Sequence, residues 1–100
     1  MLGLLEELGP CLINDNGNST VHNPYGWNNE ANMIFVDQPA GVGYSYLDID
    51  EPVPSNSYTA AEDMHAFLQI FVSKVFPKKD QEFHISGESY AVSALFGIPR

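Results

Sequence analysis

Two short apolar runs flank one long amphipathic segment, and this order restricts the fold more than any other feature of the chain. Residues 31–37 hold four consecutive apolar side chains, and a run without alternation is typical of a strand buried on both faces. Residues 83–86 are predicted to form a second short strand. Between them, residues 59–76 place apolar side chains at the 3.6-residue period of a helix. Strand, crossover helix and a strand parallel to the first form a βαβ unit, so the sequence predicts an α/β fold with a mostly parallel sheet.

The helix has start and stop signals. Thr59 and Glu62 match a Thr-x-x-Glu capping box, which predicts the first turn there. Glu62 and Asp63 would then lie in the first turn and Lys74 in the last, and both placements complement the helix dipole. Pro77 ends the helix.

The first 30 residues contain breaks that exclude a long helix. Gly9-Pro10 interrupts the apolar segment 1–13, and residues 14–30 are rich in Asn, Gly and Pro. We expect a loop or short hairpin there, with Tyr25 and Trp27 as packing anchors. Residues 41–58 are predicted to form a long loop.

Charge excludes one class of partner. The 100 residues carry 13 acidic and four basic side chains, a net charge of −9. Because no basic patch is available to neutralise phosphates, we expect no nucleic-acid partner.

No apolar run approaches the ~18 residues that span a bilayer, so no membrane partner is expected. The apolar start is too short for a signal peptide, and none is expected in this chain.

No metal or cofactor is predicted. Gly41-Val42-Gly43 lacks the third glycine of a dinucleotide loop, because Tyr46 stands in its place. The acids Asp48, Asp50 and Glu51 lack the spacing and glycine of an EF-hand, so they indicate a solvated acidic loop.

Two residues are candidates for covalent modification. Cys11 is the only cysteine, so it is either a small buried side chain or the partner of a cysteine outside this chain. Asn18-Ser19-Thr20 is an N-glycosylation sequon within a predicted loop, which makes Asn18 a candidate glycan site.

The second predicted strand leads directly into Gly87-Glu88-Ser89-Tyr90-Ala91. A strand followed by Gly-x-Ser-x-small is the pattern of a nucleophile elbow, a sharp strand-to-helix turn that raises the serine hydroxyl above the sheet. The positions two residues before and after the serine approach each other, so they must be small, as Gly87 and Ala91 are. The pattern makes Ser89 a candidate nucleophile and the Tyr90 backbone N–H a candidate oxyanion donor; the alternative is that Ser89 only caps the following segment.

Several blocks in a fixed order resemble the serine carboxypeptidase family, a family of the α/β-hydrolase fold. Besides the elbow, the similar blocks are Gly3 to Pro10, Asn23-Pro24-Tyr25-x-Trp27-Asn28, Ala31-Asn32 through Asp37-Gln38-Pro39, and Gly41-Val42-Gly43-Tyr44-Ser45-Tyr46. The resemblance covers residues 2–91, and we expect residues 1–91 to be an incomplete domain of this type.

The resemblance implies roles for three elbow residues. Ser89 would form the acyl-enzyme, the Tyr90 N–H would bind the oxyanion, and Glu88 would help to recognise the free carboxylate of the substrate. The carboxyl group of Glu88 and that of the substrate would then lie close enough to share a proton. Sharing a proton favours an acidic working pH. The resemblance thus implies a serine-type carboxypeptidase that takes peptide or protein C-termini as substrates, in a vacuolar, lysosomal or secreted glycoprotein. The oligomeric state is not implied.

The triad of this fold follows the chain order Ser, acid, His. No Asp, Glu or His follows Ser89, so we expect the 100-residue chain to be inactive alone. His22, His65 and His84 precede the elbow and are interpreted as structural.

Residues 92–100 depart from the family pattern, because Val92 stands where close helix–strand packing requires glycine. Val92-Ser93 can be encoded by a typical intron start, so we interpret 92–100 as a non-family tail, consistent with translated intron.

Two other functions stay open. A related acyltransferase would use the same scaffold to pass the acyl group to an alcohol, although Glu88 suits a peptide carboxylate better. A non-catalytic binding protein would require stable folding of the chain by itself. We expect the opposite, because residues 33–36, Phe83 and Ile85 would be left partly uncovered.

Overall fold

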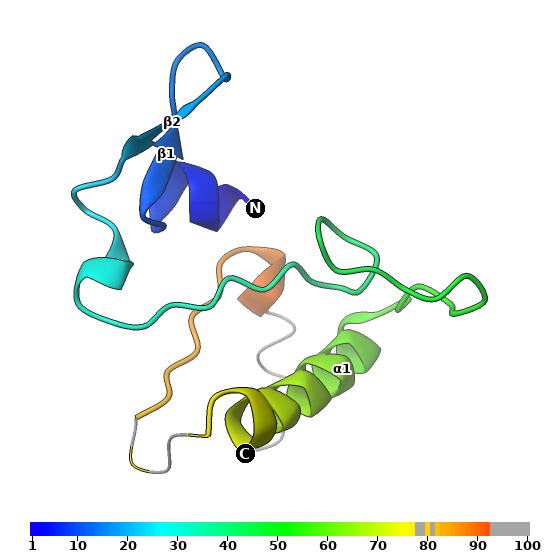
Figure 1. The fold of residues 1–100 in the computed structure, drawn as a ribbon. Helices are drawn as coiled ribbons and strands as arrows, with labels where there is room; N and C mark the ends of the chain where they lie inside the picture. The colour runs from blue at the N-terminus through cyan, green and yellow to red at the C-terminus, as the bar shows by residue number, and fades with distance from the viewer. Residues whose placement is uncertain (78–79, 81, 93–100) are drawn as a thin grey trace. The chain divides into compact units, whose positions relative to one another are not determined.

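The computed structural model describes residues 1–77, 80 and 82–92, and the chain divides into two units, Met1–Asp37 and Gln38–Arg100. Figure 1 shows the first unit in blue to cyan and the second from green to orange. The second unit contains every residue predicted for catalysis.

The first unit contains the only sheet in the described residues, a two-stranded antiparallel hairpin. Strand β1 (Cys11–Ile13) pairs with β2 (Thr20–His22), with Leu12 opposite Val21. The connecting loop closes by a hydrogen bond from the Asn14 N–H to the Ser19 carbonyl (3.1 Å), and Gly17 takes the left-handed φ of 67° that its turn requires. Of the loop or short hairpin predicted for residues 14–30, the structure shows a hairpin, but its first strand lies before that range, at Cys11–Ile13.

Short helical turns flank this hairpin. The π-type turn η1 (Gly3–Glu7) precedes β1, and the 3-10 turn η2 (Trp27–Asn29) follows β2. As the Gly9-Pro10 break predicts, η1 stops before residue 9. Gly9 is buried, and a Cβ there would lie 1.9 Å from the Leu4 carbonyl oxygen, so only glycine fits.

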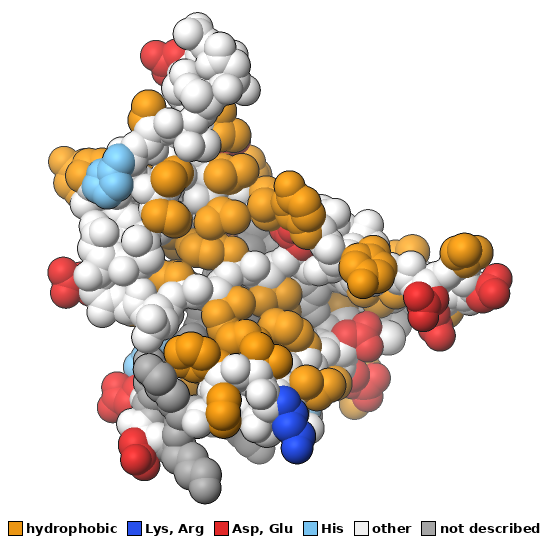
Figure 2. Space-filling model, in the orientation of Figure 1, with side chains coloured by type: hydrophobic (Ala, Val, Ile, Leu, Met, Phe, Trp, Pro, Cys, Tyr) orange, Lys and Arg blue, Asp and Glu red, His pale blue; other side chains and the backbone are white. Residues whose placement is uncertain are grey.

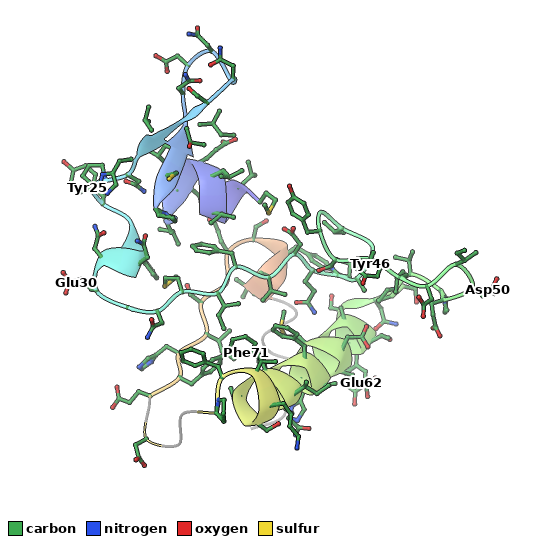
Figure 3. The ribbon with its side chains drawn as sticks, viewed as in Figure 1. Tyr25, Glu30, Tyr46, Asp50, Glu62 and Phe71 are labelled. Atoms are coloured by element: carbon green, nitrogen blue, oxygen red, sulfur yellow. The ribbon has the colours of Figure 1, made fainter. Side chains whose placement is uncertain are left out.

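The prediction that Tyr25 and Trp27 are packing anchors is wrong for this structure. Tyr25 is 86% exposed and Trp27 is 49% exposed. The backbone holds the segment instead, because the Trp27 N–H donates to the Leu8 carbonyl (2.9 Å) and the Asn23 N–H donates to the Pro10 carbonyl (2.8 Å). Figure 3 shows the Tyr25 side chain at the outer edge of this unit.

The second unit is built on one long helix, α1 (Ser57–Ile70), which continues as the π-type turn η3 (Phe71–Val75). The predicted helix is confirmed, as is its end before Pro77 with Lys74 in the last turn. Ala60 and Ala61, with exposed fractions of 1% and 0%, are the two buried apolar side chains among the described residues. The ring of Phe71 lies 5.8 Å from that of Phe67 and 6.1 Å from that of Phe76, centroid to centroid.

The predicted capping box at Thr59 is wrong. The N-cap is Asn56, whose side-chain oxygen accepts a hydrogen bond from the Thr59 N–H (2.9 Å), and the helix begins at Ser57. Asparagine is as good a cap as threonine or better, and here the Asn56 side chain satisfies an N–H of the first turn. Glu62 and Asp63 therefore lie beyond the first turn.

The predicted parallel βαβ unit is not seen in the described residues. Residues 31–37 and 83–86 lie on both sides of α1 in the chain, but neither run is paired into a sheet. A parallel strand needs neighbouring strands and helices on both faces, and the described chain has a single long helix. Apolar side chains of both runs are left exposed, as expected, and Figure 2 shows hydrophobic side chains (orange) at the surface. The exposed apolar side chains of these runs include Ile34, Val36, Phe83 and Ile85.

Candidate active site

The site predicted around Ser89 lies on a sharp turn. Ser89 has φ = 55° and is the one non-glycine residue with positive φ among those the structure describes. The left-handed region costs an L-residue roughly 1–2 kcal/mol, so it is adopted where the surrounding turn demands it. A strained serine at the start of a helix is the geometry that a nucleophile elbow requires.

Backbone hydrogen bonds close this turn. The Ala91 N–H donates to the Glu88 carbonyl (3.1 Å) and the Val92 N–H donates to the Ser89 carbonyl (3.2 Å). Residues 90–92 are helical. Within the described residues the Tyr90 N–H, directly after the serine, has no hydrogen-bond partner. It is therefore available for an anionic oxygen near Ser89.

The side chains of the turn lie on the surface of the chain. Glu88, Ser89 and Tyr90 are all exposed, whereas Gly87 is half-buried. Hence a carboxylate and a hydroxyl from consecutive residues are exposed next to Tyr90 and its backbone N–H.

A contact distant in sequence reaches the same turn. The Ser57 hydroxyl donates a hydrogen bond to the Tyr90 phenol oxygen (3.1 Å), and these residues are 33 positions apart. Ser57 is the first residue of α1, so the start of the helix is joined to the residue after the candidate nucleophile. Nothing in the sequence pattern pairs positions 57 and 90, and the sequence analysis missed Ser57.

The first turns of α1 are held by several hydrogen bonds and by burial. Asn56 caps the helix by its side chain and also accepts a hydrogen bond from the Ala60 N–H through its carbonyl. The Gln38 side chain donates to the Ala60 carbonyl, next to a cis Gln38–Pro39 bond. Because Ala60 and Ala61 are also buried, Ser57 is presented from a fixed backbone.

The surroundings of the three histidines differ from one another. His22 is on β2, the His65 ring contacts the Gln69 side chain (2.7 Å), and the exposed His84 ring lies 3.4 Å from the Glu82 carboxylate. Among the described residues, none of them hydrogen-bonds to Ser89. No base activates the hydroxyl within this part of the chain.

Residues for a metal are likewise not gathered. In the described ranges no three His, Cys, Asp or Glu side chains lie close enough to hold an ion. The loop that carries Asp48, Asp50 and Glu51 projects from the second unit, and Figure 3 shows Asp50 at its tip. Within the same ranges no helix is long and apolar enough to cross a bilayer.

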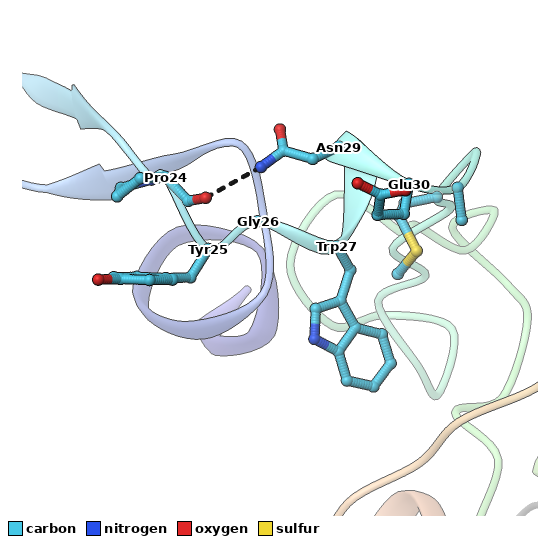
Figure 4. A pocket seen from close by; sticks show the side chains of 8 residues that line it. Pro24, Tyr25, Gly26, Trp27, Asn29 and Glu30 are labelled. Carbon is cyan, nitrogen blue, oxygen red and sulfur yellow. Dashed lines mark hydrogen bonds between the residues drawn. The ribbon is translucent and has the colours of Figure 1, made fainter.

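An open pocket of about 440 Å³ lies in the first unit (Figure 4). Asn29 donates to the Pro24 carbonyl across its rim (3.0 Å). The pocket contains none of the predicted site residues, so no chemistry is assigned to it; its walls are Pro24, Tyr25, Gly26, Trp27, Asn29, Glu30, Ala31 and Met33.

The two candidates for covalent modification are in the hairpin unit. Cys11 is half-buried on β1 and unpaired within the chain. Asn18 is exposed in the loop between β1 and β2, where the Asn14 side chain donates to its oxygen (3.2 Å).

Comparison with known proteins identifies the family. The serine carboxypeptidase family model matches residues 1–93. The chain belongs to the serine carboxypeptidase family. The family prediction is thereby confirmed, and membership implies the α/β-hydrolase fold, of which the described residues form a small part.

Relatives of this serine carboxypeptidase chain come from fungi and plants. It is 49% identical to a carboxypeptidase Y homolog A of Leptosphaeria maculans over 91% of its length, and 45% identical to a serine carboxypeptidase-like protein of Arabidopsis thaliana over 89%. It is also 48% identical to a vacuolar serine-type carboxypeptidase of Saccharomyces cerevisiae over 89% of its length. The chain spans only 16%, 20% and 17% of these three relatives, respectively.

Proposed function

We propose that the full-length protein to which this chain corresponds is a serine-type carboxypeptidase, with Ser89 as its nucleophile. The observation that carries the proposal is the left-handed φ of Ser89 at the start of a helical turn, within a chain of the serine carboxypeptidase family. An elbow of this kind presents the hydroxyl for attack on a carbonyl.

The proposed reaction has two covalent steps. The Ser89 oxygen bonds to the carbonyl carbon of the last peptide bond, and a histidine base outside this chain takes its proton and passes it to the departing amine. The C–N bond breaks and releases the C-terminal amino acid. Water, deprotonated by the same base, then hydrolyses the acyl-enzyme and restores the Ser89 hydroxyl.

The neighbours of Ser89 have roles in this proposal. The available Tyr90 N–H stabilises the oxyanion of the tetrahedral intermediate. Glu88, whose side chain is exposed beside the serine, hydrogen-bonds the substrate carboxylate through a shared proton. Such a shared proton requires an acidic medium, which fits a vacuolar, lysosomal or secreted location.

The incomplete architecture follows from the same proposal. In the full-length protein, residues 31–37 and 83–86 become parallel strands flanking α1, and residues 1–91 belong to one α/β-hydrolase domain. Their exposed apolar side chains support this assignment, because further strands and helices of the domain would cover them. The interpretation of 92–100 as a non-family tail stays a prediction; residues 93–100 lie outside the described residues.

The test begins with the transcript. We would sequence it across the Ala91–Val92 junction and upstream of Met1, and express the protein that it encodes. Wild-type protein should release the last residue from blocked dipeptides, and Ser89→Ala should lower kcat by at least about 10⁴-fold. A fluorophosphonate should label Ser89, with loss of fluoride as the O–P bond forms. Labelling of a different residue would refute the assignment, and turnover only of acyl-glucose donors would favour the acyltransferase.

Glu88 has a separate test in the same protein. Glu88→Gln should weaken the preference for a free C-terminal carboxylate over the C-terminal amide of the same peptide, while fluorophosphonate labelling continues. Glu82→Gln is the matched control, because the Glu82 side chain is exposed, lies 3.4 Å from the His84 ring and is not at the elbow. Equal effects of the two substitutions would remove Glu88 from substrate recognition.

We also propose that Asn18 carries an N-linked glycan in the secretory pathway. Its exposure in the hairpin loop supports access to the sequon. Protein from a eukaryotic host should lose one glycan in Asn18→Gln but not in Asn16→Gln, as measured by the intact mass before and after deglycosylation. An unchanged glycan mass in Asn18→Gln would contradict the assignment.

A further inference from the structure

We infer that Ser57 is a positioning residue for the oxyanion site, acting through the side chain of Tyr90. The inference rests on the proposed function, and it assigns a role to a residue far from the elbow in sequence. Its basis is the hydrogen bond from the Ser57 hydroxyl to the Tyr90 phenol oxygen (3.1 Å).

Tyr90 is the point at which this contact would matter. Its backbone N–H directly follows the nucleophile and has no partner within the described residues, whereas the next two N–H groups are used in the turn. The orientation of the Ser89–Tyr90 peptide is therefore held by the turn on one side and by the Tyr90 side chain on the other. The hydrogen bond from Ser57 restricts that side chain to one direction, which limits the rotation available to the peptide.

Ser57 meets the requirement for such an anchor, because its own position is fixed. Asn56 caps the helix immediately before it, and Ala60 and Ala61 bury the next turn. A hydroxyl on a mobile loop would move with Tyr90 and would restrict nothing.

The topology favours the same contact in a complete domain. In a βαβ unit the crossover helix begins after the carboxyl end of the first strand, and the second strand ends at that same edge of the sheet. The start of α1 and the elbow would therefore meet at one edge once residues 31–37 and 83–86 pair as strands.

The chemistry predicts a modest and selective effect. Deleting an oxyanion donor lowers kcat by about 10²–10³-fold, whereas loosening its orientation removes only part of that stabilisation. Loss of one neutral hydrogen bond should lower kcat by about threefold to tenfold. Because the substrate carbonyl binds before charge develops, KM should change less than kcat.

The test compares Ser57→Ala, Tyr90→Phe, their combination and Ser57→Thr in the full-length protein. Ser57→Ala and Tyr90→Phe should each lower kcat and the rate of fluorophosphonate labelling by about threefold to tenfold. The double variant should be no slower than either single one, because both remove the same bond. Ser57→Thr keeps a hydroxyl and should restore the rate.

Distinct outcomes separate the inference from the proposed function. An unlabelled Ser89 in the wild type would defeat the proposed function itself. Normal labelling of wild type with unchanged kcat in Ser57→Ala, or independent and multiplying losses in the double variant, would overturn the positioning role alone. Tyr90→Phe leaves α1 intact, so it keeps the test decisive if Ser57→Ala unfolds.

Discussion

The side-chain amide of Asn23 donates a 2.9 Å hydrogen bond to the carbonyl of Gly9, and this contact joins the end of the β1–β2 hairpin to the segment before it. Asn23 is only 2% exposed, and it also donates to the Glu7 carbonyl (3.0 Å) and accepts from the Tyr25 N–H (3.0 Å). Every polar atom of this buried side chain is therefore used, as a buried amide requires.

Replacing Asn23 by alanine should destabilise the full-length protein by about 2–4 kcal/mol, because two carbonyls and one N–H lose their partner, one of them in a buried place and the others in part-buried ones. Asn29→Ala is the control, since it loses a single exposed hydrogen bond to Pro24 and should cost less than about 1 kcal/mol. Urea unfolding of both variants measures the difference. Equal urea midpoints of the two variants would contradict the claim that the Asn23 hydrogen bonds stabilise the fold.

Gly9→Ala should prevent the first unit from forming. The new methyl group would lie 1.9 Å from the Leu4 carbonyl oxygen, a clash that requires the backbone to move. Gly3→Ala is the matched variant, because its methyl group would meet only the Glu7 carboxylate at 3.8 Å. The soluble yield and the thermal unfolding temperature should fall for Gly9→Ala and stay near the wild-type values for Gly3→Ala. Equal yields and unfolding temperatures of the two variants would refute the steric argument.

The two assignments of the N-cap of α1, to Asn56 or to Thr59, predict opposite effects of alanine substitutions. If Asn56 is the cap, Asn56→Ala should cost about 1 kcal/mol of stability and Thr59→Ala clearly less. A capping box at Thr59 would reverse that order. Thermal unfolding of the full-length variants, with Asn56→Ser as a capping-competent control, decides between them.

The 100-residue chain by itself should show no sharp thermal transition. Among its described residues only two apolar side chains are buried, both alanines, and burial of a larger one contributes roughly 1.5–3 kcal/mol that is missing here. We expect strong binding of a hydrophobic dye and a broad change in circular dichroism on heating. A single cooperative transition without dye binding would contradict this expectation and support a self-sufficient binding protein.

The helix, the hairpin and the elbow were predictable because their determinants are local. The apolar period over 59–76, the turn residues of 14–19 and the small residues around Ser89 each act within a few positions of the chain. The exact cap was not predictable, since Asn56 and Thr59 are both suitable and lie three residues apart.

The sequence by itself determined the family, the position of the long helix and the place of the sharp turn at Ser89, because each depends on residue types at short spacing. Only the tertiary structure decided that Ser57 meets Tyr90, that Asn23 is buried, and that Tyr25 and Trp27 are exposed. Such contacts depend on which distant segments pack together, and the local pattern of residue types does not specify which segments these are. The predicted strands at 31–37 and 83–86 stay unpaired in the described residues, because a strand is stabilised by its neighbours in a sheet and not by its own sequence.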